Sequence, residues 1–488
     1  MKPKLEDGIL KGIALCVWIY IVLRARLIPI TIDEVSTCIN HLPRTYWEIL
    51  TYAGDATPNN HILNTLLIKG LVWFLGMNHF VVRIPVLIGS LLYLWAGLNL
   101  TRRLPGFWFQ LCAFVLLVAN PYMLEFFALA RGYGLGIGMM MMAILQAVIY
   151  IDTRKDAAVA KGLVFAFLAV AANFTLLNFF VPFVFFFSVI VFQYSGQRFW
   201  RVAWLLPAAL VITGLFCYLP VTRMRATDQF QFWHANGFFK DTLFPLISSS
   251  TLRYDYIGGK TIDYLVGFAV LFAVGAWITA IVRLLRAKGR LETTGFISAL
   301  FAGTVVVNLL NVLILNTPFL DSRTALFFYP LFALQLIVVA QWLQQRWGNR
   351  VYLYLAPICF FALFNTCVAL NFSNTYEWWF DGGTFQVLDY FKETYEKEHP
   401  DKPYTLDSKW VMLNSLMFHI EHSTPHYEQY IKLAGWHGHR EYPRDTEFFY
   451  TDSSEDVDAL ISAYDIVLRV PQCSLVLLRK KKDLQPNQ

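Results

Sequence analysis

Residues 31–65 read TIDEVSTCINHLPRTYWEILTYAGDATPNNHILNT and form the first polar stretch of an otherwise largely apolar chain. They follow directly on residues 9–30, ILKGIALCVWIYIVLRARLIPI, an apolar run long enough to cross a bilayer. Two adjacent carboxylates, Asp33 and Glu34, therefore stand where the chain leaves the membrane. A charged pair at this position is either a solvated anchor or a reactive site at the membrane surface.

The composition places the chain among membrane proteins. Hydrophobic residues make up 57% of its 488 residues and charged residues only 15%, whereas soluble domains carry about 25% charged residues. The net charge of +6 is modest, and no basic patch interleaved with aromatic residues indicates nucleic-acid binding. The sequence contains no CxxC pair, so it indicates neither a zinc site nor a disulfide framework.

The apolar runs predict a polytopic α-helical protein with about eleven transmembrane helices. The predicted spans are 9–28, 81–101, 107–127, 132–151, 161–178, 179–194, 202–221, 262–283, 293–315, 325–343 and 351–371. Residues 61–76 are short for a crossing and carry Lys69 in their middle. We interpret them as an amphipathic or re-entrant helix on the outer face.

Lysine and arginine clusters predict the orientation of these spans. With residues 61–76 left out of the count, the basic clusters all fall in loops on the side of the N-terminus, which the positive-inside rule assigns to the cytoplasm. These clusters are Lys2, Lys4 and Lys11, Arg102 and Arg103, Arg154 and Lys155, Arg198 and Arg201, residues 283–290, and Arg346 and Arg350. An odd number of spans then places the C-terminus outside.

Composition also predicts two domains. Residues 1–372 form the membrane domain, with a first external loop at 31–80 and a long external loop at 222–261 that is rich in aromatic residues. Residues 373–488 are richer in charge, glycine and proline, and they are numerous enough for a small extracytoplasmic α/β domain. There TFQVLDYFKETYEK has helical periodicity, and PYTLDS, EFFYT, DIVLRV and SLVLLRK resemble short strands.

The first external loop holds the candidate catalytic acids. We expect one carboxylate of the Asp33–Glu34 pair to act as a general base on an acceptor hydroxyl, or to help orient it. Asp55, in the same loop, is a candidate second acid. Solvation of the membrane interface is the alternative role of the Asp33–Glu34 pair.

Arginines at the outer ends of later spans are candidates for binding an anionic headgroup. Arg131, with Tyr133 beside it, and Arg323 fit this role because guanidinium pairs with phosphate in bidentate geometry; snorkelling at the membrane surface is the alternative. Weaker candidates for substrate contact are Asn59, Asn60, His61, His234 and Lys240. A turn with a helix cap explains the first three equally well, a structural role explains His234, and a charged loop rim explains Lys240.

Together these features suit a lipid-phosphate substrate, and their order resembles the GT-C membrane glycosyltransferases. The resemblance covers roughly residues 1–370 and is to bacterial relatives of protein O-mannosyltransferases and of aminoarabinose lipid A transferases. It rests on Asp33–Glu34 after the first span, Asp55–x–x–Pro58–Asn59–Asn60–His61 before an apolar helix, Gly76, Arg83–Ile84–Pro85, Ala130–Arg131–Gly132–Tyr133–Gly134–Leu135, and residues 323–330.

The resemblance implies inverting transfer of a sugar from a polyprenyl phosphate to a lipid, glycan or protein acceptor. It implies the catalytic carboxylate at Asp33 and the donor phosphate at Arg131 and Arg323. The chain departs from the pattern at two places. Arg131–Gly132–Tyr133 stands where many members carry a second acid after the third span, and Asn59–Asn60 stands where a proline pair or Glu–Lys–Pro is commoner.

The sequence therefore predicts a glycosyltransferase of the bacterial inner membrane that needs no cofactor; a divalent cation is not indicated but stays open. A lipid-linked-glycan flippase or transporter is the main alternative, although it predicts charges at mid-span rather than at span ends. A scaffold that binds partners through residues 376–488 is the third.

Overall fold

The structure is a computed structural model that describes residues 3–229, 237–251, 259–286, 291–315, 317–423, 426–434, 446–453 and 460–481. The chain divides into two compact units. We call Met1–Val22, Arg44–Leu67 and Ile84–Leu370 the helical unit. We call Leu23–Pro43, Ile68–Arg83 and Asn371–Gln488 the α/β unit.

Long apolar helices make up most of the helical unit. In chain order the helices of this part are α1 (Pro3–Leu27), α3 (Tyr46–Thr51), α4 (Ile62–Leu75), α5 (Ile84–Thr101), α6 (Phe107–Val118), α7 (Pro121–Phe126), α8 (Gly132–Thr153), α9 (Asp156–Ala172), α10 (Leu177–Ser195), α11 (Phe199–Ala203), α12 (Leu205–Ala226), α13 (Phe244–Thr251), α14 (Gly259–Arg286), α15 (Thr293–Leu315), α16 (Phe328–Trp347) and α17 (Tyr352–Ala369). α1 and α4 end in the α/β unit.

Within the described residues, seven ranges are long and apolar enough to cross a membrane. One of them, Phe328–Ala369, contains both α16 and α17. Every predicted span overlies a helix, so the chain is a multi-pass membrane protein as predicted. The expected count of about eleven spans stays a prediction.

The predicted span 107–127 is broken in the structure. α6 ends at Val118, and α7 begins at Pro121. The side chain of Asn120 accepts a hydrogen bond from the Met123 N–H at 2.8 Å, and proline at the first helical position needs no N–H partner. This Asn–Pro cap starts a new short helix and places residues 121–126 outside α6.

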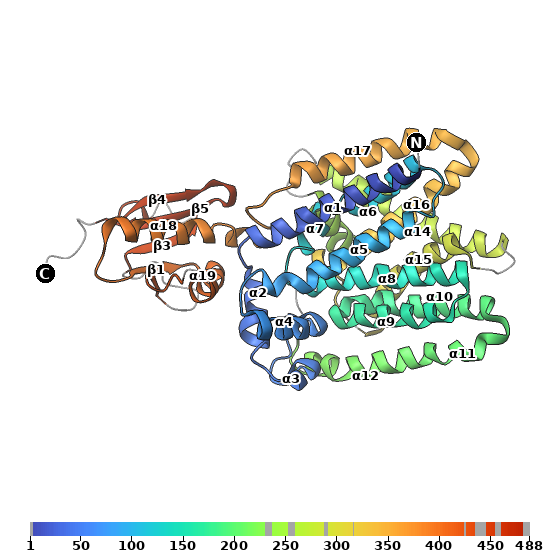
Figure 1. Cartoon of the computed structure of the whole chain (residues 1–488), viewed down its shortest axis with the longest axis horizontal. Coiled ribbons are helices and arrows are strands. Elements are labelled where there is room, and N and C mark those ends of the chain that lie inside the picture. Colours follow the sequence, from blue (N-terminus) through green and yellow to red (C-terminus); the bar gives the residue numbers. More distant parts are fainter. Residues whose placement is uncertain are drawn as a thin grey trace. The chain divides into compact units, whose positions relative to one another are not determined.

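α8 is the buried centre of the helical unit and packs on both α5 and α9 (Figure 1). Glycine allows this close approach. A Cβ added at Gly138 would overlap the carbonyl oxygen of Gly89 in α5, and a Cβ at Gly134 would lie 2.6 Å from the Phe126 carbonyl oxygen. The Gly132–Gly138 ladder therefore serves helix packing.

The predicted surface helix at residues 61–76 forms as α4, Ile62–Leu75. Its 14 residues span about 21 Å, less than the roughly 30 Å of a bilayer core. The Lys69 ammonium donates to the Leu42 carbonyl oxygen at 2.5 Å, which explains a lysine inside an apolar helix. Trp73 and Phe74 near its end are 78% and 76% exposed, as suits a membrane interface.

The C-terminal part of the α/β unit is a five-stranded sheet of order β2-β1-β3-β5-β4 with two helices. Its elements are α18 (Thr384–Glu398), β1 (Tyr404–Ser408), α19 (Trp410–His422), β2 (Ile431–Leu433), β3 (Phe448–Asp452), β4 (Tyr464–Val470) and β5 (Leu475–Lys480). β1 is parallel to β2 and β3, whereas β5 is antiparallel to β3 and β4. The predicted α/β fold of this region is confirmed, whereas its bounds at 373–488 and its extracytoplasmic position stay predictions; α19 and β2 were not predicted.

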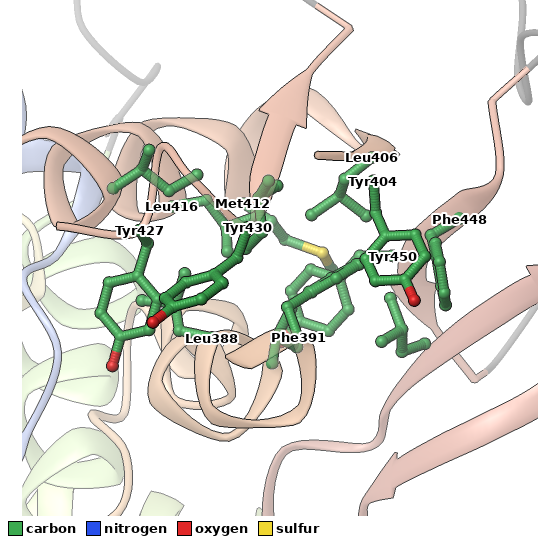
Figure 2. Close-up of a cluster of buried hydrophobic side chains, with 14 of the residues drawn as sticks. Leu388, Phe391, Tyr404, Leu406, Met412, Leu416, Tyr427, Tyr430, Phe448 and Tyr450 are labelled. Atoms are coloured by element: carbon green, nitrogen blue, oxygen red, sulfur yellow. The ribbon is translucent and has the colours of Figure 1, made fainter. Parts of the chain in front are cut away.

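One face of this sheet packs against both helices (Figure 2). Alternation along β3 turns Phe448 and Tyr450 toward Phe391 of α18 and Leu416 of α19. Phe449 points to the other face, where Leu460, Ala463, Tyr464, Ile466, Val476 and Leu478 cover it. The central strands β1, β3 and β5 are therefore mostly buried, whereas the edge strands β2 and β4 are partly exposed.

Candidate functional site

The segment that carries the acids leaves α1 and starts a new helix, α2 (Ile32–Ser36), followed by a π-helical turn, Thr37–His41. Thr31 precedes α2, and Glu34 folds back on it. The Glu34 Oε2 atom accepts from the Thr31 N–H at 2.8 Å and from its hydroxyl at 3.1 Å. This is the reciprocal cap expected of threonine followed three residues later by glutamate.

Glu34 also pairs with Arg83, and both side chains are fully buried. The Arg83 Nε–H donates to Glu34 Oε1 at 2.8 Å, and Nη2 donates to Oε2 at 2.6 Å. The remaining guanidinium hydrogens go to the carbonyl oxygens of Ala25 (2.9 Å), Ile28 (2.7 Å) and Pro29 (2.8 Å). All five donors of the guanidinium are thus used, and the pair joins the end of α1 to the start of α2.

Asp33 differs from its neighbour. It is half-buried, whereas Glu34 is buried with both carboxylate oxygens engaged. Asp33 is the second residue of α2, so the cap that fixes the start of α2 also fixes its backbone position. Of the two adjacent acids, Asp33 is the one that is partly exposed to solvent.

A third carboxyl group, Asp381, approaches the same segment. Its Oδ2 atom accepts from the Ile32 N–H at 2.9 Å, and Oδ1 has no hydrogen-bond partner among the described residues. Burial raises the pKa of the Asp381 carboxyl well above its usual range; the Ile32 N–H lowers it, and the charges of Glu34 and Asp33 raise it further. We call Asp33, Glu34, Arg83 and Asp381 the acid group.

Two histidines lie beside the acid group. The His419 Nε2 atom accepts from the Ile30 N–H at 3.1 Å, and the Ser415 hydroxyl donates to the Ile30 carbonyl oxygen at 2.7 Å. The His79 ring lies 5.2 Å from the His419 ring, and its Nε2 lies 2.9 Å from the Arg26 carbonyl oxygen. Burial lowers the pKa of His79 to about 4 and that of His419 well below its usual value, so both are neutral at pH 7.

Sequence reasoning singled out neither Asp381 nor the histidines. In the sequence, Asp381 is only part of the change in composition after the last predicted span. Ile32 and Asp381 are 349 residues apart, and Ile30 and His419 are 389 apart. A local pattern carries no signal of contacts at such separations. Arg83 belongs to a motif of the family resemblance, and the sequence does not indicate that it pairs with Glu34.

The helical unit gathers a second set of predicted residues. Arg131 immediately precedes α8, is 2% exposed, and donates from Nη1 to the side-chain oxygen of Asn59. Its guanidinium carbon lies 5.9 Å from the centre of the Tyr133 ring. The Tyr133 ring meets the His61 ring edge-on at 5.0 Å. We call Asn59, His61, Arg131 and Tyr133 the cation group.

Close packing holds the cation group. A Cβ at Gly132 would overlap the carbonyl oxygen of Ala172 and lie 2.7 Å from the Cβ of His61. The Asn64 side-chain amide donates to the carbonyl oxygen of Ala130 at 3.0 Å. The start of α4 is thereby fixed against residues 130–133, and a buried guanidinium in a low-dielectric setting attracts an anion more strongly than one in water.

The other candidates of the first loop lie near the cation group in sequence. The Asn60 side-chain amide donates to the Ile49 carbonyl oxygen at 3.0 Å, and Tyr52 donates to the backbone of Asn60, so Asn60 ties the loop to α3. Asp55 lies 4.0 Å from the Arg44 guanidinium, and both side chains are mostly buried.

Arg323 and Lys240 lie on two segments that touch each other. Arg323 is half-buried on a 3₁₀ turn, Ser322–Ala325, and Lys240 is exposed on a π-helical turn, Phe238–Leu243. The Thr242 hydroxyl donates to the Leu320 carbonyl oxygen at 2.5 Å and links the two segments. The remaining candidate, His234, lies outside the described residues.

Glu125 is a further acid that sequence reasoning missed. It lies on α7, is 3% exposed, and stands six residues before Arg131. Glu125 lies within the predicted span 107–127, so the sequence places it inside an apolar run. The Asn120–Pro121 cap is the signal that reveals it, because the new helix places Glu125 beyond the end of α6.

A pocket of about 400 Å³ lies in the helical unit between α5, α8, α15 and α16. Its polar lining includes Thr101, Arg103, Asp152, Thr293 and Gln341. None of the predicted site residues lines it.

No protein-family model matches the sequence, and no curated protein matches it. Solved structures do match. ArnT from Cupriavidus metallidurans in the apo state is similar over 99% of both chains, with 14% identity and a TM-score of 0.48. The same protein bound to undecaprenyl phosphate is similar over 99% of both chains, with 13% identity and a TM-score of 0.47. The Archaeoglobus fulgidus oligosaccharyltransferase, in complex with Zn and sulfate, is similar over 90% of this chain and 64% of that chain, with 12% identity and a TM-score of 0.43.

At identities of 14% or less and TM-scores of 0.48 or less, these likenesses carry no argument about this chain.

Proposed function

We propose that the chain is an inverting membrane glycosyltransferase. It moves a sugar from a polyprenyl-phosphate donor to a lipid, glycan or protein acceptor. The observation that supports this most is the different environment of two adjacent acids: Glu34 is locked in a buried pair with Arg83, and Asp33 beside it is left accessible. A carboxylate held by a fixed frame at the end of a membrane span suits a general base.

In the proposed reaction Asp33 takes the proton of the acceptor hydroxyl as its oxygen bonds to the anomeric carbon. The bond from that carbon to the phosphate oxygen breaks on the opposite face, and polyprenyl phosphate leaves with the bonding electron pair. The sugar therefore changes its anomeric configuration. Glu34 acts through Arg83 to keep α2 in place, and Asp55 is proposed as a second acid of the first loop.

The cation group is proposed to bind the donor phosphate. Negative charge grows on the leaving phosphate as the glycosidic bond breaks, and a guanidinium already held in place stabilises that charge. Arg131 is buried, and Tyr133 and Asn59 contact its guanidinium. We propose Arg323 as a second phosphate ligand, and His61, Asn60, His234 and Lys240 as weaker contacts to donor or acceptor.

We propose that the reaction takes place on the outer face of the bacterial inner membrane. The basic loops support a cytoplasmic N-terminus and an extracytoplasmic C-terminal part. The exposed Trp73 and Phe74 of α4 support a position of this helix at the membrane–water interface.

The test is sugar transfer by purified protein in detergent from a synthetic polyprenyl-phosphate sugar. We expect release of polyprenyl phosphate and a product of inverted configuration. Asp33→Asn should slow transfer by about 10²- to 10⁴-fold, whereas Asp401→Asn, at an exposed acid, should leave the rate unchanged. Full activity of Asp33→Asn would exclude the proposed role. Lipid movement across vesicles with no transferred sugar would favour the transporter.

A further inference from the structure

We propose that Asp381 and His419 are positioning residues for Asp33. They hold the backbone just before α2, so that the helix starts at one fixed place and presents Asp33 in one orientation. This rests on the proposed function only in that Asp33 is taken as the reacting carboxylate; the contacts themselves stand independently of it.

The main evidence is that three consecutive backbone N–H groups donate to side-chain acceptors. The Ile30 N–H donates to His419 Nε2, the Thr31 N–H to Glu34 Oε2, and the Ile32 N–H to Asp381 Oδ2. The distances are 3.1, 2.8 and 2.9 Å. Each acceptor is thus a titratable side chain, and two of the three come from the C-terminal part of the chain.

These contacts matter because residues 28–31 lie between two helices, where the ladder of helical hydrogen bonds is interrupted. Buried backbone groups must find partners, and an unpaired one costs free energy. Ile30 is fully buried, and Ser415 supplies the partner for its carbonyl oxygen. Asp381, Ser415 and His419 therefore help to set the path of the chain into α2, together with Glu34 and Arg83.

The surroundings indicate positioning rather than proton transfer for Asp381 and His419. Both are buried, with exposures of 2% and 0%. The His419 ring accepts the Ile30 N–H and its Nδ1 lies 2.9 Å from the Ser423 hydroxyl, so both ring nitrogens are engaged. Neither side chain is exposed to solvent, whereas Asp33 is partly exposed.

Two substitutions of Asp381 separate the possible roles. In Asp381→Asn the amide oxygen still accepts the Ile32 N–H, whereas in Asp381→Leu no acceptor remains in a similar volume. The full-length protein in detergent is followed by hydrogen exchange of the peptide containing residues 28–36. Peptides from β3 and β5 serve as the internal reference, and Asp401→Asn serves as the control variant.

We expect Asp381→Leu to speed exchange of the 28–36 peptide by about tenfold, the effect of losing one buried hydrogen bond. Exchange in β3 and β5 should not change, and Asp381→Asn should behave as wild type. In the transfer assay Asp381→Leu should lower kcat with little change in the KM for the donor, and Asp381→Asn should restore kcat.

Unchanged exchange of the 28–36 peptide in Asp381→Leu would overturn the proposal. Loss of kcat in Asp381→Asn with wild-type exchange would overturn it as well, because Asp381 would then act in the chemistry. If Asp381→Leu also speeds exchange in β3 and β5, the same comparison is made with His419→Gln and His419→Leu. Glutamine keeps an acceptor for the Ile30 N–H and should behave as wild type, whereas leucine does not and should speed exchange of the 28–36 peptide. A wild-type protein that transfers no sugar would refute the proposed function, and the exchange data would still decide the positioning role.

Discussion

The acid group and the cation group are built in different ways. In the acid group the polar contacts form a buried network in which Arg83 uses all of its donors and three consecutive N–H groups meet side-chain acceptors. In the cation group glycine packing and an aromatic edge contact hold Arg131 next to the start of α8.

This difference fits the two proposed tasks. A general base must meet one hydroxyl at hydrogen-bond distance, so its backbone has to be fixed within narrow limits. A cation that binds phosphate has to remain charged and shielded from water, and close packing is enough for that. We therefore expect polar substitutions to affect the acid group most, and changes of volume to affect the cation group most.

The largest stability effect is expected from breaking the Glu34–Arg83 pair. Glu34→Leu leaves a buried guanidinium without its carboxylate, which should lower the free energy of unfolding by about 3–5 kcal/mol. Melting of the purified protein in detergent measures this. The matched control is Asp152→Leu, because its pair with Arg103 is exposed and should contribute less than about 1 kcal/mol. Equal shifts for both variants would contradict the structural role of Glu34.

The protonation of His79 gives the next effect. Because the pKa of His79 is about 4 in the folded protein and about 6.5 when unfolded, the unfolded state binds an extra proton between these values. The contribution of neutral His79 to the free energy of unfolding should therefore be complete above pH 6.5. The free energy of unfolding should fall by on the order of 3 kcal/mol as the pH drops toward 4. His79→Gln should flatten the dependence of the melting temperature on pH, and His426→Gln, at an exposed site, should not. If His79→Gln leaves the slope of melting temperature against pH unchanged, His79 is not a buried neutral histidine in the folded protein.

A change of volume tests the cation group. Gly132→Ala forces a Cβ against Ala172 and His61 and should cost about 1–3 kcal/mol. Gly214→Ala, on α12, meets no atom within 4 Å and should leave the melting temperature unchanged or slightly higher, because alanine favours helix. Similar behaviour of the two alanine variants would show that close packing at Gly132 is not required.

Much of the fold was predictable because it is local. Apolar runs predict the spans, and alternation predicts β1, β3, β4 and β5. The composition also located Asp33–Glu34 at the end of the first span. A helix boundary is harder to predict where two helices share one apolar run. At Asn120–Pro121 a side-chain cap divides α6 from α7 within such a run.

The candidate site was predictable only in part. The sequence presents Asp33 and Glu34 as equivalent neighbours, and the contact with Arg83 is what separates them. Asp381 and His419 reach residues 30–32 across more than three hundred positions, so only the tertiary fold brings them there. The contact of Arg131 with Asn59 joins two motifs that the sequence placed in order but not in space.

The most direct test compares polyprenyl-phosphate binding with sugar transfer in variants of the acid group and the cation group. The measurement is the affinity of the purified protein for polyprenyl phosphate without a sugar, in wild type, Asp33→Asn and Arg131→Gln. We predict that Arg131→Gln weakens binding by about tenfold or more, whereas Asp33→Asn binds as wild type although its transfer of sugar is slowed by about 10²- to 10⁴-fold. Wild-type affinity in Arg131→Gln would contradict the account.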